Sequence, residues 1–587
     1  MKHFYWDEHA VEEDLRTLKE NEIEILRVFP NWRDFQPVEQ LYGSSGQPRQ
    51  LCLSGDSRPA NPYYLDERML SRFQDFCALA QKYGFRLIVG LVTGWMSGRL
   101  YVPPALHGKN VFLDPLALKL QQMLIKGIVS RFRDQDCIYA WDLGNECNCM
   151  GADLSEEEAY SWTAFITNAI RAQDPTRKIF SGMHSLELEK GWTIQDQGEL
   201  TDELTTHPYP YWVEHCLVDP LTSCRTLLHA TAQTQYYAAI SKKPCLVEEI
   251  GGMGPMIADE EHTAQFIRAN LFSNWANGAT GLLWWCAHDQ TKLTAPPYDW
   301  NMCERELGML DENRRPKPML LEMKKFSQLM DQLNLNLPRR TADGVCVLTQ
   351  GQDHWGIAYM TYLLGKQANL TLDFAYCEQE LPDSPLYLLP SVTNLTMSKY
   401  SYDRLKQRVA QGATLYLSMD DGFLTEFEEL TGLRVVLARN AEDEGSLCLP
   451  DGQQIPYHRW HILKLLATRA EVLAQDSQGD PFITRAAYGK GQVLFVNFPL
   501  ERMLIHRPDC TEEAFHVVYR DLFAPIWSQK CVISENPHIG QTEHKTHDGA
   551  IAVLINYSSV PQPTRLCLHE AFVIDKDIDI TTVYFCT

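Results

Sequence analysis

The sequence has few of the features that mark membrane, secreted or nucleic-acid-binding proteins. Its longest apolar runs are well short of the ~20 residues that span a bilayer. The first fifteen residues contain neither the basic segment nor the apolar segment of a secretory signal. Basic residues number 53 against 76 acidic ones, for a net charge of -23, and a phosphate backbone is bound by clustered Lys and Arg. We therefore expect a cytoplasmic protein with no membrane and no nucleic-acid partner.

The 17 cysteines include no C-x-x-C pair. Without an export signal, they are most simply interpreted as reduced thiols in a cytoplasm. Cys147 and Cys149 form a C-x-C, but no His or Cys at zinc-ligand spacing accompanies them. The sequence therefore predicts no metal site at these cysteines.

At 587 residues the chain is too long to fold around a single hydrophobic core, so more than one domain is expected. Up to residue 337, the sequence alternates amphipathic helices with short apolar segments. Near-continuous apolar strands between helices predict a parallel sheet that is covered on both faces. Seven such strands over this length predict a (β/α)8 TIM barrel. The predicted helices are 8–21, 66–83, 117–133, 156–172, 223–240, 262–277 and 317–335, and the predicted strands are 23–29, 86–93, 138–145, 178–185, 204–209, 244–251 and 280–289.

The first strand of this barrel is apparently missing or truncated. The first element is a helix, and only MKHFYWD, a poor candidate for a buried strand, comes before it. Two interpretations remain open. Either the barrel is open or patched at this point, or the chain starts late relative to its relatives and the first strand lies upstream of Met1.

Two further domains are expected after the barrel of residues 1–337. Residues 338–530 contain a second alternating set, with GVCVLTQ, LYLLP, ATLYLSM and GQVLFVNFP as strands, which predicts a doubly wound, flavodoxin- or amidotransferase-like α/β domain. No G-x-G-x-x-G follows its first strand, so a nucleotide role has little support. Residues 531–587 alternate apolar and polar positions and predict a small antiparallel β-domain.

Acidic residues stand at the ends of two predicted barrel strands. WDLGNE ends in Glu146, and LVEEIG holds Glu248 and Glu249. Carboxyl groups at the C-terminal ends of different barrel strands meet at the mouth of the barrel. Glycoside hydrolysis with retention needs two carboxyl groups about 5–5.5 Å apart, one to attack the anomeric carbon and one to protonate the leaving oxygen. An isolated Glu more often caps a helix or pairs with a basic residue, but two on separate strand ends favour catalysis.

These motifs resemble those of clan A glycoside hydrolases, and within the clan those of family 5, which place the two glutamates on strands four and seven. Asn145 and Glu146 match the Asn-Glu pair of the acid/base, and Glu249 with its following Ile-Gly matches the nucleophile better than Glu248 does. The resemblance implies that Glu146 is the acid/base and Glu249 the nucleophile. We expect Glu248 to point to the opposite side of its strand, because side chains alternate.

Four other family positions have matches in this sequence. Arg27, in LRVFPNW, matches the strand-two arginine that binds the nucleophile, and His207 and Tyr209, in THPYPYW, match the strand-six pair beside the two glutamates. Trp285 matches the tryptophan of strand eight on which the sugar stacks. The resemblance also implies that Asn145 binds the sugar 2-hydroxyl.

The residues that follow the strands are further candidates for the sugar pocket. Trp32, Trp95 and Trp212 come after strands two, three and six and could line subsites, although each could equally be a packing residue. Asp34 and Gln36 are placed to meet sugar hydroxyls.

The chemistry sets requirements on both carboxyl groups. Glu146 has to be protonated, so we expect its pKa to be raised, in part by the charge of Glu249. Arg27 and Tyr209 are expected to keep Glu249 ionised. The mechanism needs no metal or organic cofactor.

The resemblance covers most of the chain. A family 5 barrel followed by these two domains is similar to the β-mannosidase-like subgroup, and the domain order is similar to that of family 42 β-galactosidases, whose middle domain helps to form the oligomer. It implies a retaining β-mannosidase and a homo-oligomer through the second domain. The absence of an export signal favours exo action on short, imported β-mannosides, because an endo-acting enzyme is usually exported to reach its polymer. The alternatives are a β-galactosidase, a β-glucosidase or an endo-β-mannanase with the same glutamates, or a non-catalytic carbohydrate-binding protein.

Overall fold

The computed structural model describes residues 6–56, 58–211, 215–216, 218–296, 298–299, 302–394, 396–449, 452–527, 530–547, 549–568, 572–578 and 581–586. The chain forms two compact units. The first is Met1–Tyr209, Ser241–Leu271 and Ala279–Leu335, and the second is Pro210–Ile240, Phe272–Gly278 and Asn336–Thr587. The segments 210–240 and 272–278, predicted as part of the barrel, therefore group with the second unit, and so do residues 531–587. Across the described residues, no helix has the length and apolar character to cross a membrane.

The first unit is built around parallel strands. They are β1 (Ile25–Val28), β4 (Arg86–Gly90), β7 (Ile138–Asp142), β8 (Lys178–Phe180), β9 (Leu204–Thr206), β10 (Cys245–Ile250) and β11 (Leu282–Trp284). Hydrogen bonds join them in the orders β1-β4-β7-β8 and β11-β10-β9, every pair being parallel, and a parallel bridge between Phe180 and Glu203 links the two sets. In the described part of the chain β1 is preceded by helix α1 (Glu8–Glu20), as the sequence predicts, and β1 pairs with β4.

One apolar cluster fills the space that these strands surround. It consists of one side chain from each of six strands, namely Ile25, Ile88, Ala140, Phe180, Leu246 and Leu283. Inward-facing side chains that meet in a layer are the packing of a TIM barrel interior. The first unit is therefore a TIM-barrel region.

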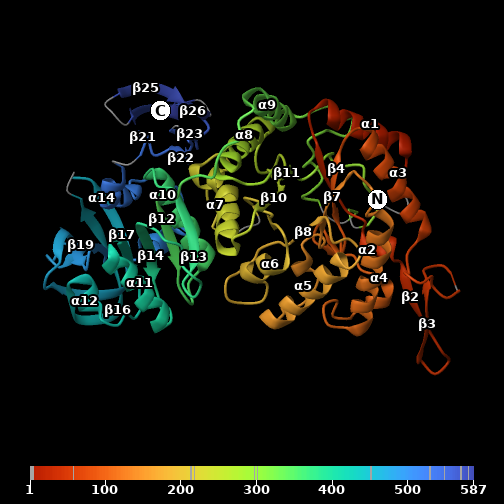
Figure 1. Ribbon diagram of the computed structural model, residues 1–587, viewed down its shortest axis with the longest axis horizontal. Helices are drawn as coiled ribbons and strands as arrows, with labels where there is room; N and C mark the ends of the chain where they lie inside the picture. Colours follow the sequence, from red (N-terminus) through yellow and green to blue (C-terminus); the bar gives the residue numbers. More distant parts are fainter. Residues whose placement is uncertain are drawn as a thin grey trace. The chain divides into compact units, whose positions relative to one another are not determined.

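Helices cover the outside of the strands, and their ends follow from capping residues. Figure 1 shows α3 (Glu67–Lys82), α4 (Pro115–Phe132) and α5 (Glu156–Arg171) around β4, β7 and β8. Asp66, Asp114 and Ser155 cap their N-termini with side-chain oxygens that accept backbone N–H groups, and Ser155 forms a capping box with Glu158. The remaining helices of this part of the chain are α2 (Trp32–Phe35), α6 (Ile194–Leu200), α8 (Glu260–Asn277) and α9 (Pro318–Leu333).

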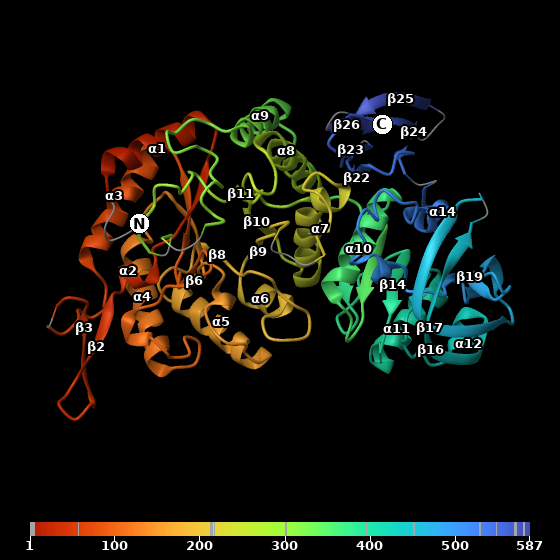
Figure 2. The same ribbon diagram turned by 180° about the vertical axis from the view of Figure 1, so that it is seen from behind.

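Two hairpins of the first unit were not predicted. β2 (Val38–Tyr42) and β3 (Pro48–Leu53) form a hairpin that extends away from the helices, as Figures 1 and 2 show. The short strands β5 (Trp95–Met96) and β6 (Arg99–Leu100) form the other, in the loop that follows β4.

The second unit contains a seven-stranded sheet in the order β13-β12-β14-β15-β20-β19-β18. Its parallel strands are β12 (Gly344–Leu348), β13 (Leu372–Tyr376), β14 (Leu386–Val392), β15 (Thr414–Met419) and β20 (Gly491–Val496), with β18 (Glu471–Gln475) and β19 (Pro481–Tyr488) antiparallel. Its helices are α7 (Cys224–Ser241), α10 (His354–Gln367), α11 (Lys399–Gln411), α12 (Phe427–Thr431), α13 (Leu500–Leu504) and α14 (His516–Trp527). The parallel strands with intervening helices agree with the predicted doubly wound pattern.

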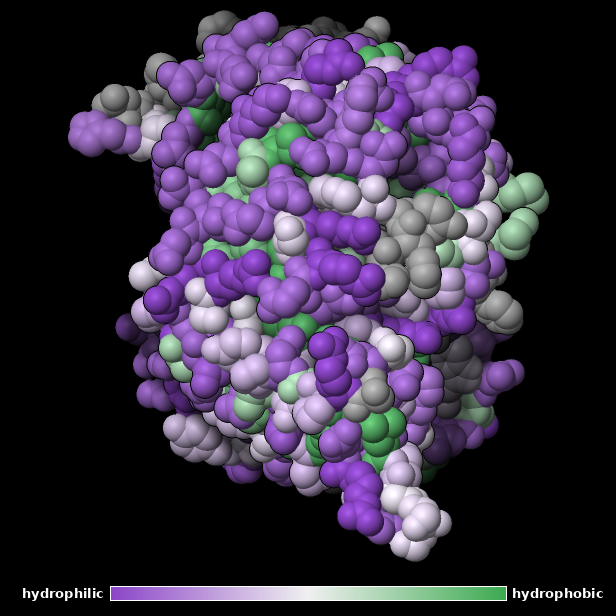
Figure 3. All heavy atoms as spheres, turned by 90° about the vertical axis from the view of Figure 1, so that its right-hand side faces the viewer, coloured by the Kyte–Doolittle hydropathy of each residue, from purple (hydrophilic) through white to green (hydrophobic). Residues whose placement is uncertain are grey.

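The rest of the second unit is antiparallel. A long hairpin of β16 (Leu433–Cys448) and β17 (Gln454–Ala467) precedes β18, and two three-stranded sheets, β21-β24-β25 and β22-β23-β26, end the chain. The strands of these sheets are β21 (Val532–Ser534), β22 (Ile539–Lys545), β23 (Ala550–Asn556), β24 (Gln562–Leu568), β25 (Phe572–Ile578) and β26 (Thr581–Cys586). The molecular face in Figure 3 is mostly hydrophilic, with hydrophobic residues in small separate patches, as expected of a surface rich in charge.

Candidate active site

A polar layer lies directly above the apolar barrel layer, because side chains two positions apart on a strand share a face. Arg27 follows Ile25 in this way, Asp142 follows Ala140, and Glu248 follows Leu246. Gly182, two residues after Phe180, has φ +57°, and a Cβ there would collide with the Asp142 carboxylate. Glycine at this position therefore makes room for a buried carboxylate under the barrel mouth.

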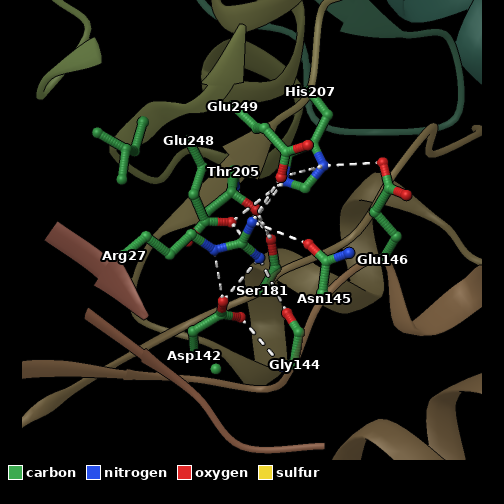
Figure 4. Close-up of polar contacts among 12 residues, drawn as sticks. Arg27, Asp142, Gly144, Asn145, Glu146, Ser181, Thr205, His207, Glu248 and Glu249 are labelled. Atoms are coloured by element: carbon green, nitrogen blue, oxygen red, sulfur yellow. Dashed lines mark hydrogen bonds and ion pairs between the residues drawn. The ribbon is translucent and has the colours of Figure 1, made fainter. Parts of the chain in front are cut away.

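Arg27 is the centre of this layer (Figure 4). Its Nε and Nη2 donate to Asp142 Oδ2 at 2.9 and 2.8 Å, and Nη2 also donates to the Gly144 carbonyl at 3.0 Å. Its Nη1 donates to Glu249 Oε2 at 2.9 Å and to Asn145 Oδ1 at 3.1 Å. The Arg27 side chain is only 5% exposed. One buried guanidinium therefore fixes residues from two strand ends, those of β7 and β10, through a fork of donors that lysine does not have.

Glu248 points into the barrel, as Glu249 does, so the prediction that the two side chains lie on opposite faces of the strand is wrong. Its Oε2 is 3.2 Å from Arg27 Nη2 and 3.4 Å from His207 Nε2, and its side chain is fully buried. The regular alternation from Leu246 turns Glu248 inward. The pairing of β10 with β11 then shifts register between Val247 and Ile250. An irregular strand end allows two consecutive side chains to reach the same guanidinium.

Glu249 is held by donors on both of its oxygens. The Tyr209 hydroxyl donates to Oε1 at 2.6 Å, and Arg27 donates to Oε2. His207 Nδ1 stands 3.8 Å from Oε2. The sequence predicted contacts of Arg27 and Tyr209 with this carboxylate, and the structure brings all three residues together.

Glu146 follows β7 in a left-handed conformation, with φ 45° and ψ 51°. Few non-glycine residues adopt this conformation, and it is often found at functional sites. Glu146 Oε1 is 3.0 Å from His207 Nδ1 and 3.1 Å from His184 Nδ1. His207 Nδ1 also lies 3.8 Å from Glu249 Oε2. The distance between Glu146 Oε1 and Glu249 Oε2 therefore cannot exceed the sum of these two contacts. The separation of about 5–5.5 Å that a retaining pair needs lies below this upper limit, so the contacts allow it.

The charges of this cluster differ from those predicted. Burial raises the pKa of Glu146, but hydrogen bonds from His184 and His207 outweigh it and bring that pKa well below its usual range. Burial lowers the pKa of His207, but the charge of Glu249 and the bonds to Glu146 and Glu248 outweigh it and raise that pKa to about 10. Burial raises the pKa of Glu249, against the lowering by His207 and Arg27.

In the free site, the pKa of Glu146 is therefore lowered and that of Glu249 raised, which is the reverse of the expected order. The physical reason is the position of His207, whose imidazolium contacts Glu146 and Glu248 and faces Glu249. Asp142 is a further carboxyl group of the cluster, and burial, followed by the charge of Glu248, raises its pKa to about 7. His207, whose pKa is raised, lies one hydrogen bond away from Glu146, whose pKa is lowered.

Trp285 lies at the edge of this cluster, as predicted. Its indole Nε1 donates to Glu304 Oε2 at 3.3 Å, and the Ser97 hydroxyl donates to the same oxygen at 2.6 Å. Burial, with further contributions from the active-site carboxylates, raises the pKa of Glu304 to about 6. Phe29 packs edge-on against Trp285, with ring centroids 6.0 Å apart. Trp285, the residue predicted to form the sugar platform, thus has a third carboxyl group beside it.

Trp32 does not line a pocket, which corrects its predicted role in substrate binding. It is 0% exposed, and its Nε1 donates to Gln36 Oε1 at 2.8 Å. Gln36 is also fully buried and donates to the Leu120 carbonyl. A four-residue helix after β1 turns these side chains into the wall of the unit, a turn that the sequence pattern did not show.

The other proposed pocket residues have mixed positions. Asp34 is 8% exposed and accepts from the Tyr101 hydroxyl at 3.0 Å. The Trp95 carbonyl accepts from Asn145 Nδ2 at 3.1 Å, so this segment helps to orient Asn145. Trp212 lies outside the described residues.

We expect Trp32→Phe to lower the free energy of unfolding and to leave substrate binding unchanged. The substitution removes the indole N–H and leaves the buried Gln36 oxygen without a donor, which costs about 1–3 kcal/mol. Thermal unfolding and the KM of the variant check this. A raised KM at unchanged stability would show that Trp32 contacts the substrate. Trp285→Phe is the matched substitution, and it should raise KM.

Three residues of the site were missed by the sequence reasoning, namely Asp142, His184 and Glu304. Asp142 and His184 both follow apolar strands that were recognised, in WDLGNE and KIFSGMHS, and a polar residue at a barrel strand end was the available signal. Glu304 lies in a loop beyond β11, where no periodicity indicates a position in the site.

Comparisons with known proteins agree with this geometry. Residues 2–290 match the model of the family Cellulase (glycosyl hydrolase family 5). The chain is 30% identical over 146 residues to a mannan endo-1,4-beta-mannosidase F of Aspergillus clavatus, which covers 24% of this chain. The match covers 30% of that relative, so the chain spans under a third of its length.

Solved structures show the same fold over most of the chain. The exo-beta-1,4-mannosidase Op5Man5 from Opitutaceae bacterium strain TAV5 superposes with a TM-score of 0.73 at 22% identity, covering 88% of this chain and 92% of its own. A beta-galactosidase from Bacillus circulans sp. alkalophilus has a TM-score of 0.69 at 13% identity, covering 98% of this chain and 95% of its own. The chain is thus an α/β protein with a TIM-barrel region and an additional β-rich C-terminal region.

Proposed function

Because residues 2–290 belong to glycosyl hydrolase family 5, which confirms the predicted family, we propose that this enzyme is a retaining exo-β-mannosidase. It removes mannose from the non-reducing end of short β-mannosides. The observation that carries the proposal is the pair Glu146 and Glu249, which both face His207 Nδ1 at the barrel mouth. These contacts allow the separation of about 5–5.5 Å at which two carboxyl groups flank one anomeric carbon in a retaining enzyme.

In the first step a Glu249 oxygen attacks the anomeric carbon. A C–O ester bond forms to the enzyme, and the bond to the leaving oxygen breaks as Glu146 gives that oxygen a proton. In the second step water attacks the same carbon from the opposite face, Glu146 takes the proton of the water, and the ester bond breaks. Two inversions leave the configuration of the sugar unchanged.

His207 supplies the proton that Glu146 lacks in the free site. Its Nδ1 is 3.0 Å from Glu146 Oε1, so the proton moves along an existing hydrogen bond when the substrate excludes water. Its Nε2 faces Glu248 at 3.4 Å, and this carboxylate keeps the ring oriented while the proton moves. The return of the proton in the second step restores the free site.

Tyr209 and Arg27 stabilise the negative charge of Glu249 until it attacks. Both donate to its carboxylate before attack, and the negative charge on Glu249 falls as the ester forms. Arg27 retains Asp142 and Glu248 as partners throughout, so it needs no rearrangement. Such donors, fixed before the reaction, lower the barrier because they require no reorganisation.

Two comparisons and one contact support mannose as the sugar and exo action. Most of the chain shares its fold with an exo-β-1,4-mannosidase, and a relative by sequence is a mannan endo-mannosidase. Ser97 and Trp285 both bind Glu304 at the edge of the platform, which places a carboxylate where it can accept bonds from sugar hydroxyls. A β-galactosidase is the second candidate, because a protein of that activity shares the fold over nearly the whole chain.

We expect p-nitrophenyl β-mannoside to be cleaved with a kcat/KM at least about tenfold above that of the β-galactoside, β-glucoside and β-cellobioside, a preference worth about 1.4 kcal/mol in the transition state. Rates on this panel are the measurement. A dominant galactoside rate would replace mannose by galactose, and faster cleavage inside manno-oligosaccharides than at their ends would contradict exo action. No rate on any glycoside would favour a carbohydrate-binding protein. The cytoplasmic location and the homo-oligomer stay predictions.

A further inference from the structure

Two histidines and a carboxylate converge on one point at the barrel mouth. The oxygen Glu146 Oε1 is 3.1 Å from His184 Nδ1 and 3.0 Å from His207 Nδ1, and the three ligand atoms all lie within 4.8 Å of one another. They come from three different strand ends, after β7, β8 and β9. Two imidazole nitrogens and one carboxylate oxygen form the donor set of open zinc sites, in which a fourth position is left for water or substrate.

The two contacts of Glu146 Oε1 are close to the ligand spacing around a tetrahedral cation. Zinc binds nitrogen and oxygen at about 2.0–2.2 Å, so neighbouring ligand atoms around a tetrahedron lie roughly 3.3–3.5 Å apart. The two measured contacts of Glu146 Oε1 are only a few tenths of an ångström shorter. A cation would therefore need small movements of the side chains, and the exposed part of His184, 29%, provides the route from solvent.

The second nitrogen of His207 has the partner that a metal-binding histidine requires. Its Nε2 faces the buried Glu248 Oε2 at 3.4 Å. A histidine that binds a metal through one nitrogen commonly donates the N–H of the other to a carboxylate, which fixes the tautomer and strengthens the ligand. Binding of a cation would release the Nδ1 proton of His207 and leave the proton on Nε2, and the Nδ1 lone pair then points to the same place as Glu146 Oε1. The remaining oxygen of Glu248 is buried, and no protein donor in the described residues reaches it.

We propose that His184, His207 and Glu146 form a binding site for a zinc-type divalent cation, and that its occupation switches the enzyme off. The cation takes the lone pair of Glu146 Oε1 that a proton would otherwise occupy, so Glu146 can neither protonate the leaving oxygen nor activate water. The inhibition rests on the proposed glycosidase function, whereas the binding does not. Zinc is favoured over magnesium or calcium because imidazole nitrogen is a ligand for the softer metals.

Calorimetric titration of the full chain with ZnCl2 tests the binding. We expect one site in the native protein, and a loss of affinity of at least about tenfold in His184→Ala, since His184 is a direct ligand and even outer-shell changes cost 10–100-fold. The matched control is His262→Ala, which removes an exposed histidine beside Asp259 and should bind zinc as the native protein does. Cys303 and Cys448 are exposed and can bind zinc independently, so the assignment depends on the difference between the two variants.

Co2+ supplies a readout that does not depend on activity. A tetrahedral cobalt centre absorbs visible light strongly, and we expect this absorption in the native protein and His262→Ala but not in His184→Ala. If His184→Ala fails to fold, His184→Asn replaces it. Equal zinc affinity in the native protein and the His184 variants, or an equal loss in His262→Ala, would overturn the site. A protein that binds zinc through His184 and hydrolyses no glycoside keeps the site and loses the proposed function.

Discussion

Glu249→Ala should reduce the turnover of an aryl β-mannoside by about five orders of magnitude or more, which is a large part of what a glycosidase gains over the uncatalysed reaction. The neighbouring Glu248 is not placed to replace it, because it is buried below the mouth with its Oε2 on Arg27 and His207. Loss of Glu249 also removes the acceptor of the Tyr209 hydroxyl and one of the two acceptors of Arg27 Nη1. The steady-state rate with p-nitrophenyl β-mannoside measures the loss.

Azide distinguishes loss of the nucleophile from loss of structure. It fits the space of the missing carboxylate and attacks the anomeric carbon directly, so the product of the variant should be the α-mannosyl azide, with one inversion instead of two. Glu248→Ala is the matched control, since it removes a carboxylate from the same strand and the same arginine. Its activity should also fall, but azide should not restore it. Rescue of Glu248→Ala, with none for Glu249→Ala, would exchange the two roles.

The difference between these neighbours shows where sequence periodicity stops being informative. Strict alternation predicts that one of the two side chains faces outward, and the family motif selects Glu249 for the pocket. The structure places both inward, because the register shift of β10 after Val247 interrupts the alternation at the strand end. Irregular strand ends are common beside active sites, and a regular period cannot locate them.

The strands of the barrel were predicted well because burial makes them nearly continuous apolar runs, and several helices because burial of one face gives them an amphipathic period. Predicted 156–172 became Glu156–Arg171, and the residue before it, Ser155, forms the cap. The hairpin of β16 and β17 was missed because most of β16 is exposed and polar, which leaves no apolar alternation to read. Burial produces the signal, and exposed strands lack it.

The residues of the site also divide into those that strand-end motifs predicted and those that they did not. Arg27, Asn145, Glu146, His207, Tyr209, Glu249 and Trp285 were identified from motifs at strand ends and lie together. Trp32 was placed in the pocket because it follows a strand, although a short helix turns it into the core. The charges were predicted from pairs, Arg27 with Glu249 and Glu249 with Glu146, whereas a histidine between three carboxylates decides them. Only the three-dimensional position of His207 contains that information.

Glu146→Ala should have an effect that depends on the leaving group. A β-mannoside whose leaving oxygen belongs to another sugar needs a proton, and we expect its kcat/KM to fall by about 10²–10⁴-fold. A 2,4-dinitrophenyl β-mannoside leaves as a stable anion, so formation of its glycosyl-enzyme should keep nearly its native rate. Hydrolysis of that intermediate then becomes limiting, because the base that activates water is gone, and a burst of dinitrophenol should precede a slow steady state.

Azide again identifies the role, with the opposite stereochemistry. It needs no base, so it should attack the accumulated glycosyl-enzyme of Glu146→Ala, accelerate the steady state and give the β-mannosyl azide. Glu146→Gln is the matched control, because it keeps an oxygen for His184 and His207 but has no proton to give. Equal losses on the disaccharide and on the dinitrophenyl substrate would show that Glu146 positions the substrate instead of transferring a proton. The Gln variant should behave as the Ala variant does if the proton is what matters, and as the native enzyme does if the oxygen is.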